Sequence, residues 1–278
     1  MNKKMKKSTK IKIGIVGLGY VGGAVRNWFE SQKGRYGLFY YDKFKEIGSV
    51  EELNKAEIIF VAVPTPFNEK RQSYDDSAIK EVLGVINDGK VIVIKSTILP
   101  GSTDLFQKQN PNKTIVFNPE FLRASTANKD FLKPDRQIVG YANSKGKKVA
   151  ETIIKILPKA PYAKIVRAKE AEMIKYFSNT YLATRVVFAN HIYDVCEKLG
   201  GVNYEVIREC LVQDKRIGNS HFDIFHEGYR GYSGGCFPKD VKAFLQLAKK
   251  LGVKVGLIQA ADKINTRLIK SNPKKISF

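Results

Sequence analysis

The chain has 278 residues, of which 43% are hydrophobic, and it contains 48 Lys and Arg against 27 Asp and Glu. This hydrophobic share, together with 22 Gly and 10 Pro, excludes a disordered, collagen-like or low-complexity protein. The length fits two modest domains. Three cysteines without CxxC spacing exclude a disulfide framework and favour a reducing compartment.

The formal net charge of +21 is concentrated at the two ends of the chain. Residues 1–10 have five Lys and no acid, and we expect them to form a basic disordered tail. Residues 242–278 contain nine Lys and Arg against one Asp. Such ends attract phosphate groups, but nucleic acid is the weaker interpretation because no zinc-finger spacing or RNP-like aromatic run is present.

The N-terminus imitates a secretion signal, because lysines precede an apolar run from Ile11 to Val25. Five glycines interrupt that run, and no small-x-small cleavage site follows it before Arg26. No stretch reaches the 18 or so apolar residues that a membrane span requires. We therefore expect a cytoplasmic protein with no membrane partner.

A glycine-rich turn follows the first predicted strand, residues 11–16, and opens a helix over residues 24–31. Gly17 permits a tight turn, Gly19 lets the backbone approach a pyrophosphate, and Gly22 lets the helix pack closely on the strand. The N–H groups at the start of that helix favour an anion. This GxGxxG predicts a dinucleotide site.

A second predicted strand, residues 38–41, ends in Asp42, 20 residues beyond the last glycine of the turn. A carboxylate at this place accepts both ribose hydroxyls of NAD and repels the 2′-phosphate of NADP. We therefore expect NAD as the cofactor.

The strand and helix patterns go on alternating, which predicts an α/β fold with a Rossmann-like, doubly wound parallel sheet. Further strands are expected at residues 57–63, 91–95, 114–117, 137–141 and 163–166. Three unusual segments, residues 63–66, 95–101 and 118–123, follow three of these strands. Ligands gather at the carboxyl ends of such strands, so these segments are candidates for a site.

The second half is mainly helical, and we expect an NAD-binding domain over residues 11–168 and a helical domain over residues 169–278. A long helix over residues 170–199 is followed by helices at 204–212, 241–251 and 255–269. Lys175 and Asn179 stand four apart in the long helix and share one face. That face is partly apolar, so Lys175 can be desolvated; the alternative is a surface lysine whose aliphatic part lies along the helix.

Cys236 lies just before the helix at 241–251, beside glycines and close to Lys239. Both the helix start and the lysine favour its thiolate, which makes it the candidate nucleophile. Cys196 and Cys210 fall inside helical patterns, and we expect both to be core residues. The histidines lack metal-ligand spacing, so no metal is assigned.

Seven motifs in order along the chain resemble the UDP-glucose/GDP-mannose dehydrogenase family. They are GLGYVG at 17–22, VPTP at 63–66, KSTILPG at 95–101, NPEFLR at 118–123, AEMIKYFSNTYLA at 171–183, DKRIG at 214–218 and GGCFPKD at 234–240. The resemblance implies an NAD-dependent four-electron oxidation of the C6 alcohol of a nucleotide sugar to a carboxylate. It also implies a homodimer, with the helix at 255–269 as a candidate interface.

The resemblance implies roles for individual residues. Cys236 forms a thiohemiacetal and then a thioester; Lys175 and Asn179 stabilise an oxyanion; Asp240 and Thr97 hold water for proton transfer; Glu120 assists thioester hydrolysis. The cofactor residues are Gly17, Gly19, Tyr20, Val21, Gly22, Asp42, Pro64, Thr65, Thr97 and Lys239. The substrate residues are Glu120, Phe121, Leu122, Arg123, Lys175, Asn179, Arg216, Tyr232 and Gly234.

Two departures from the family pattern stand out. Ala124 replaces the Glu that usually follows NPEFLR, and the third, nucleotide-binding domain of the family is expected to be absent. DKRIG favours UDP-glucose, oxidised to UDP-glucuronate; the alternatives are GDP-mannose, a UDP-N-acetylhexosamine, or a nucleotide-binding module that is inactive without a separate C-terminal domain.

Overall fold

The computed structural model describes residues 10–70, 73–226 and 228–272. The basic tail expected at residues 1–10 lies outside this range except for Lys10. The chain divides into two compact units, one reaching to Pro66 and resuming from Asp75 to Lys175, the other made of Phe67–Tyr74 and the chain from Tyr176 onward.

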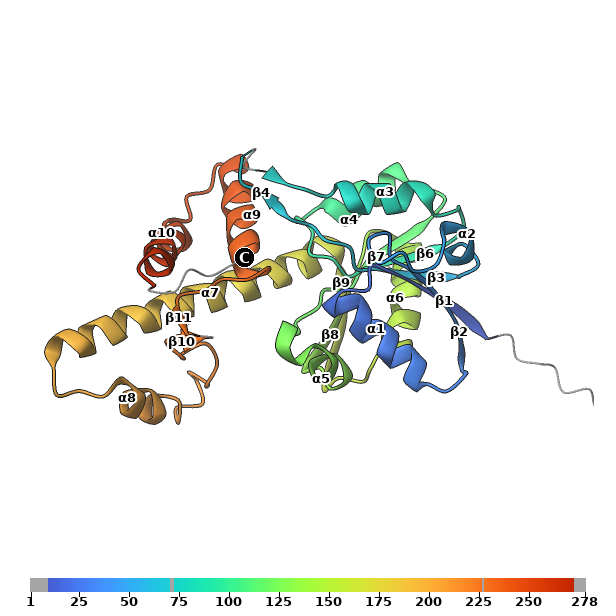
Figure 1. Ribbon diagram of the computed structural model, residues 1–278. Helices are drawn as coiled ribbons and strands as arrows, with labels where there is room; N and C mark the ends of the chain where they lie inside the picture. Colours follow the sequence, from blue (N-terminus) through green and yellow to red (C-terminus); the bar gives the residue numbers. More distant parts are fainter. Residues whose placement is uncertain (1–9, 71–72, 227, 273–278) are drawn as a thin grey trace, which may run out of the picture. The chain divides into compact units, whose positions relative to one another are not determined.

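The first unit is built on a seven-stranded sheet with the order β2-β1-β3-β6-β7-β8-β9 (Figure 1). Its strands are β1 (Ile11–Val16), β2 (Tyr36–Tyr41), β3 (Ile58–Val61), β6 (Val91–Ile94), β7 (Thr114–Phe117), β8 (Arg136–Tyr141) and β9 (Tyr162–Arg167). All seven expected strands are confirmed. Their central members are buried because they consist almost wholly of Ile, Val and Phe and are covered on both faces.

Helices cover both faces of the sheet, as expected for a doubly wound fold. One face packs against α1 (Tyr20–Ser31), α5 (Ala127–Leu132) and α6 (Ser144–Ile156) in a single apolar core. Figure 1 shows α2 (Val50–Leu53), α3 (Ser77–Val85) and α4 (Ser102–Gln109) on the other face. A 3-10 turn, Ala124–Thr126, precedes α5.

The sheet is parallel except between β7 and β8, which pair antiparallel. The three unusual segments follow β3, β6 and β7, which belong to the parallel set. Their carboxyl ends therefore lie at one edge of the sheet, where ligands of such folds bind.

The second unit is mainly helical, as expected. It contains most of α7 (Ala168–Leu199), followed by α8 (Tyr204–Leu211), α9 (Phe237–Lys250) and α10 (Gly256–Lys270), and a hairpin of β10 (Phe225–His226) and β11 (Tyr229–Arg230). A second hairpin, β4 (Phe67–Asn68) and β5 (Ser73–Tyr74), packs on α9. Neither hairpin is predicted by the sequence pattern, because two-residue strands are too short for an alternation to show.

Two apolar clusters hold this unit together. The first joins Ala183, Val186 and Val187 of α7 to Val241 of α9 and Ala261 of α10, and the second gathers around Tyr204 and Phe222. The part of the chain that the structure describes contains no helix long and apolar enough to cross a membrane.

Candidate functional site

The three glycines of the first turn have different surroundings. A Cβ on Gly17 would lie 2.6 Å from the carbonyl oxygen of Ala62, and one on Gly22 would lie 1.7 Å from that of Gly17. Gly17 also has a φ of +80°, which side chains rarely allow. A Cβ on Gly19 would meet nothing within 4 Å. Two of the glycines are therefore required for packing, while the middle one leaves open space above the turn, which fits a pyrophosphate.

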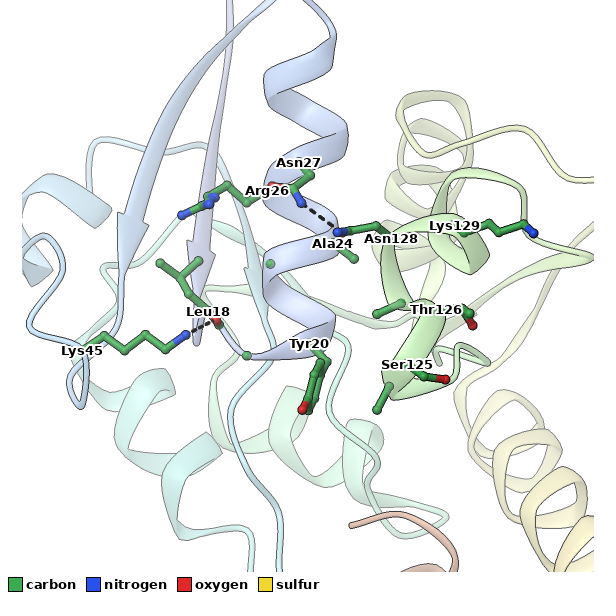
Figure 2. Close-up of a pocket in the computed structure, with 14 residues that line it drawn as sticks. Leu18, Tyr20, Ala24, Arg26, Asn27, Lys45, Ser125, Thr126, Asn128 and Lys129 are labelled. Atoms are coloured by element: carbon green, nitrogen blue, oxygen red, sulfur yellow. Dashed lines mark hydrogen bonds between the residues drawn. The ribbon is translucent and has the colours of Figure 1, made fainter. Parts of the chain in front are cut away.

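The start of α1 borders a hollow of about 780 Å³, and it presents neither a side-chain cap nor an acidic first turn. Its first N–H groups have no partner within the helix, so they can bind an anion. Figure 2 shows the hollow lined by Tyr20, Arg26 and Lys45 on one side and by residues 124–129 on the other. Ala124, which departs from the family pattern, is part of that lining.

Asp42 stands at the end of β2 and fixes the same turn. One carboxylate oxygen accepts the N–H of Leu18 at 2.7 Å, and the other accepts those of Phe44 and Lys45. Burial acts to raise the pKa of Asp42, but these three backbone N–H groups outweigh it and lower the pKa below the usual value for Asp. The oxygen bound to Leu18 keeps a lone pair that can accept a ribose hydroxyl.

The segments after β3 and β6 are bonded to each other. The Thr65 hydroxyl donates to the carbonyl oxygen of Thr97 at 2.9 Å, and the Ser96 hydroxyl donates to that of Val63 at 2.6 Å. Pro64 lies between the two bonded residues of the first segment. Thr65 and Thr97 are both buried, so the two loops form one fixed surface beside the glycine turn.

A buried ion pair joins the loop after β7 to α7. The Lys175 ammonium donates to the Glu120 carboxylate at 3.1 Å and to the Glu120 carbonyl oxygen at 2.7 Å. Both side chains are less than a tenth exposed, which confirms that Lys175 is desolvated. Removing one partner of such a pair leaves a buried charge uncompensated and costs about 3–5 kcal/mol.

The rest of the loop after β7 is held by neighbours of its own. The Phe121 ring lies beneath the Arg136 guanidinium, 3.9 Å from ring centroid to Cζ, and the Leu122 N–H donates to the Glu120 carboxylate at 2.8 Å. Arg123 donates through Nε and Nη2 to Asp130 in α5. These contacts within the protein fix the conformation of the loop.

The residues that hold the start of this loop were not predicted from the sequence. The Lys95 ammonium donates to the Asn118 side-chain oxygen at 2.8 Å, and the Asn118 amide donates to the carbonyl oxygen of Ile138 at 2.7 Å. Both residues are buried. A charged residue directly after the run Val91–Ile94 was the available signal.

In the second unit, Cys236 is the N-cap of α9, and it is exposed. Four residues later, the Asp240 carboxylate accepts a hydrogen bond from the Asn179 amide at 2.5 Å and another from Lys239 at 2.5 Å. Asp240 and Asn179 are buried. The nucleophile candidate thus sits on a helix whose first turn is anchored to α7.

Three further candidates are placed differently. Arg216 is exposed and binds Asp214 of its own loop. The Tyr232 ring is buried beside Phe237, and burial, with Asp262 adding to it, raises the pKa of its hydroxyl above the usual value. Gly234 has a φ of +76° and open space at its Cβ position. The roles of these three residues in substrate binding stay predictions.

One expectation about the cysteines is wrong. Cys196 is buried, as expected, but Cys210 is exposed, because α8 buries Tyr204 and leaves its other side chains at least partly accessible to solvent. Across residues 10–70, 73–226 and 228–272 no cluster of three or more His, Cys, Asp or Glu could hold a metal ion.

Comparison with known proteins gives two matches to one family. Residues 42–157 match the NAD binding domain of the UDP-glucose/GDP-mannose dehydrogenase family, and residues 169–267 match its central domain. The first match supports the expected NAD cofactor, although its range begins after the glycine turn.

Individual relatives agree with these matches. UDP-glucose 6-dehydrogenase of Rickettsia felis is 36% identical over 77% of this chain and 48% of its own length. UDP-glucose 6-dehydrogenase TuaD of Bacillus subtilis is 34% identical over 77% of this chain and 47% of its own length. The chain thus spans about half the length of the curated relatives it matches.

Solved structures extend the likeness to the fold. A UDP-glucose dehydrogenase from Pyrobaculum islandicum has a TM-score of 0.82 at 26% identity and covers 96% of this chain and 70% of its own. A UDP-D-ManNAc dehydrogenase from Pyrococcus horikoshii, at 23% identity, has a TM-score of 0.79 over 93% and 69% of the two chains and shows the fold alone. With both domain matches and the seven ordered motifs, the chain belongs to the UDP-glucose/GDP-mannose dehydrogenase family.

Proposed function

We propose that this chain carries out the NAD-dependent oxidation of the C6 alcohol of UDP-glucose to the carboxylate of UDP-glucuronate. The observation that supports this most is the arrangement at α9, where an exposed Cys236 stands at the N-cap position and Asp240 is bound to Asn179. A nucleophile and a fixed carboxylate on one helical turn suit a reaction with a covalent intermediate.

The first oxidation needs no covalent step. NAD supplies the chemistry of both oxidations by accepting a hydride from C6. The alcohol proton leaves to water, a step for which the resemblance implies Asp240 and Thr97, and the product is an aldehyde. Lys175 and Asn179 stabilise the negative charge that develops on the C6 oxygen.

The second oxidation requires Cys236, because a free aldehyde does not readily give up a hydride. The thiolate adds to the aldehyde carbon while the aldehyde oxygen takes a proton, which gives a thiohemiacetal. Loss of a hydride from its C–H bond and of a proton from its hydroxyl to water leaves a thioester. Water then attacks the thioester carbon with Glu120 as general base, and the C–S bond breaks to release the carboxylate and the thiol.

The test is a count of NADH per sugar. The purified chain with NAD and UDP-glucose should give two NADH for each UDP-glucuronate, and GDP-mannose or a UDP-N-acetylhexosamine should give less. No turnover with any nucleotide sugar contradicts the proposal. Cys236→Ser should abolish the complete oxidation and keep NAD binding, whereas Cys210→Ser, at the other exposed cysteine, should change neither.

A second function is favoured by the span of the matches, which is about half the length of the curated relatives. In it, the chain binds NAD but turns over only together with the remaining C-terminal part of such a protein. Adding that part as a separate polypeptide distinguishes the two. Turnover that appears only after the addition selects the second function, and turnover of the chain by itself rejects it.

We also propose that the chain forms a homodimer through α7. Exposed apolar side chains recur along one side of this helix at spacings of four and seven residues. They are Phe177, Tyr181, Phe188, Val195 and Leu199. On α10, which corresponds to the interface helix that the resemblance implies, the exposed large hydrophobic residue is Leu257. A second copy of the same stripe is the simplest cover for α7.

The cytoplasm is the location we propose, because three cysteines, an odd number without CxxC spacing, fit a reducing compartment. Nucleic acid stays the weaker partner. The test is the salt dependence of binding. If raised salt abolishes DNA binding but leaves nucleotide-sugar binding intact, the nucleotide sugar is the preferred partner.

A further inference from the structure

Asn265 is a polar residue on the buried face of α10. It is 4% exposed, and the two other residues that this helix buries, Ala261 and Leu268, are apolar. A buried amide is costly unless its nitrogen and its oxygen are hydrogen-bonded. Asparagine at a position that would suit leucine therefore indicates a role for its amide group.

The Asn265 amide is bonded to the backbone of one residue, Tyr232. Its oxygen accepts the Tyr232 N–H at 2.6 Å, and its nitrogen donates to the Tyr232 carbonyl oxygen at 2.9 Å. Asn272, seven residues later on α10, repeats this arrangement at Arg230, with distances of 2.9 and 3.1 Å. A residue of a neighbouring antiparallel strand would make the same pair of bonds. The helix α10 thus holds residues 230–232 in the way that a strand would.

Gly231 lies between the two bonded residues and lets α10 come this close. Its φ is +87°, and a Cβ at this position would lie 2.6 Å from the Asn265 amide oxygen, so no other residue fits well. The helix α7 holds the same segment through a side chain. The Arg230 guanidinium donates to the Asn190 side-chain oxygen at 2.9 Å and to the Asp194 carboxylate at 2.6 Å. The segment is therefore fixed to two helices of its unit.

The fixed segment leads directly to Cys236, four residues beyond Tyr232. Between them, the two glycines at 234–235 have no heavy atom within 4 Å of their Cβ positions, so the course of this stretch depends on how its ends are held. At one end, the Asp240 N–H donates to the Cys236 carbonyl oxygen at 3.0 Å as α9 begins. At the other end, Asn265 holds the Tyr232 backbone, and the Tyr232 ring packs on that of Phe237, with 6.0 Å between centroids.

We propose that Asn265 is a positioning residue for Cys236. By fixing Tyr232, it sets where the glycine stretch enters α9 and keeps the thiol at the start of that helix, where the backbone N–H groups favour the thiolate. Asn265 acts through the Tyr232 backbone. The inference rests on the proposed function, in which Cys236 adds to the aldehyde, and Asn265 therefore matters for the second oxidation.

The first measurement needs no ligand. Mass spectrometry follows the alkylation of Cys236 by iodoacetamide from about pH 6 to about pH 10. Because Cys236 is exposed in the unaltered chain, the rate follows its thiolate fraction. Asn265→Leu removes both bonds to Tyr232 and should move the midpoint of the profile to higher pH by about half a unit. A change in access alone would alter the rate by the same factor at every pH and leave the midpoint in place.

The ionisable groups beside Cys236 are the same in every variant. Lys239 and Asp240 belong to the first turn of α9 and bind each other. From the preceding loop, the His221 ring lies 5.5 Å from that of Phe237. A moved midpoint therefore reports the position of the thiol and not a change in its charged neighbours.

The second measurement isolates the second oxidation. The 6-aldehyde of UDP-glucose is supplied with NAD, and the formation of NADH is followed. Asn265→Leu should lower kcat by at least about tenfold, because it displaces the nucleophile. It should change KM by less than about threefold, because the substrate candidates of α7 and of the loop after β7 stay in place.

Alanine at Gly231 disturbs the same contact from the other partner. Gly231→Ala places a methyl group against the Asn265 amide oxygen, and it should reproduce both effects of Asn265→Leu. Gly228→Ala is the matched control, because Gly228 has a φ of +85° and no heavy atom within 4 Å of its Cβ position. It adds similar backbone strain without touching Asn265, so it should leave the midpoint and kcat unchanged. Circular dichroism verifies that each variant is folded.

Two kinds of result overturn the inference. One is a midpoint or a kcat that stays at the value of the unaltered chain in Asn265→Leu and Gly231→Ala; if Asn265→Leu does not fold, Gly231→Ala decides. The other is an equal effect of Gly228→Ala, which would make backbone strain the cause. If the midpoint moves as expected but the unaltered chain oxidises no nucleotide sugar, the proposed function fails while the positioning of Cys236 by Asn265 is supported.

Discussion

Glu172 in the first turns of α7 caps α4, a helix nearly 70 residues earlier in the chain. Its carboxylate accepts the N–H of Thr103 at 2.8 Å, the Thr103 hydroxyl at 2.6 Å and the N–H of Gly101 at 2.5 Å. Glu172 is fully buried. This contact fixes the start of α7 against the loop after β6, and Lys175 follows within one turn.

We expect Glu172→Gln to lower the free energy of unfolding by about 1–3 kcal/mol, because its amide group places a donor against one of these buried N–H groups. Urea denaturation measures the change. Asp104→Asn, also in the first turn of α4, is the control: its side chain is 40% exposed and makes a surface ion pair with Lys169, so the free energy should change by less than about 0.5 kcal/mol. Equal effects of the two variants would contradict the capping function of Glu172.

Alanine at two glycines of the first turn should have opposite consequences. Gly22→Ala places a methyl group on the Gly17 carbonyl oxygen and should prevent folding or lower the melting temperature sharply. Gly19→Ala fills open space and should leave the melting temperature nearly unchanged while weakening NAD binding at least tenfold. Thermal unfolding and calorimetric titration with NAD test the pair. If Gly19→Ala binds NAD as tightly as the unaltered chain, the pyrophosphate does not lie above Gly19.

The stability of the chain should depend on the protonation of Lys95. Its pKa in the folded chain is about 8, below the value near 10.5 of an exposed lysine. Between these values the unfolded chain binds more protons, so the contribution of Lys95 to stability rises with pH across this range, by about 3 kcal/mol. Below pH 8 both states are protonated and the contribution is constant.

Lys95→Met should remove that rise. The difference in unfolding free energy between the variant and the unaltered chain is therefore largest in favour of the variant below pH 8, and it shrinks toward pH 10.5. Chemical denaturation at several pH values measures this difference, with Lys113→Met as control. A difference that stays constant with pH would show that Lys95 is not a buried ammonium.

The exposed stripe on α7 predicts the oligomeric state. Phe188 is 57% exposed at the middle of the stripe, so Phe188→Asp should leave each chain folded and convert a dimer into monomers. Leu257→Asp on α10, where the side chain is 73% exposed, should leave the dimer intact. Light scattering of the three proteins decides between the helices; dissociation by Leu257→Asp alone would assign the interface to α10.

Much of the fold could be read from local sequence. The buried strands show as runs of Ile, Val and Phe, and the helix α7 ends where Gly200 and Gly201 follow it. The desolvation of Lys175 and the position of Cys236 at a helix start were also predictable. These features depend on hydrophobic periodicity and on the conformational preferences of residues close together in the chain, and both are visible in the sequence itself.

Partners distant in sequence could not be read in this way. The antiparallel pairing of β7 with β8, the hairpin of Phe67–Tyr74 on α9 and the exposure of Cys210 all depend on which elements meet. So do the contacts of Glu120 with Lys175 and of Lys95 with Asn118. The sequence by itself determined the kinds of element and the residues able to do chemistry. The tertiary structure decided which of them are buried together, because charge pairing and desolvation arise only when separate segments pack.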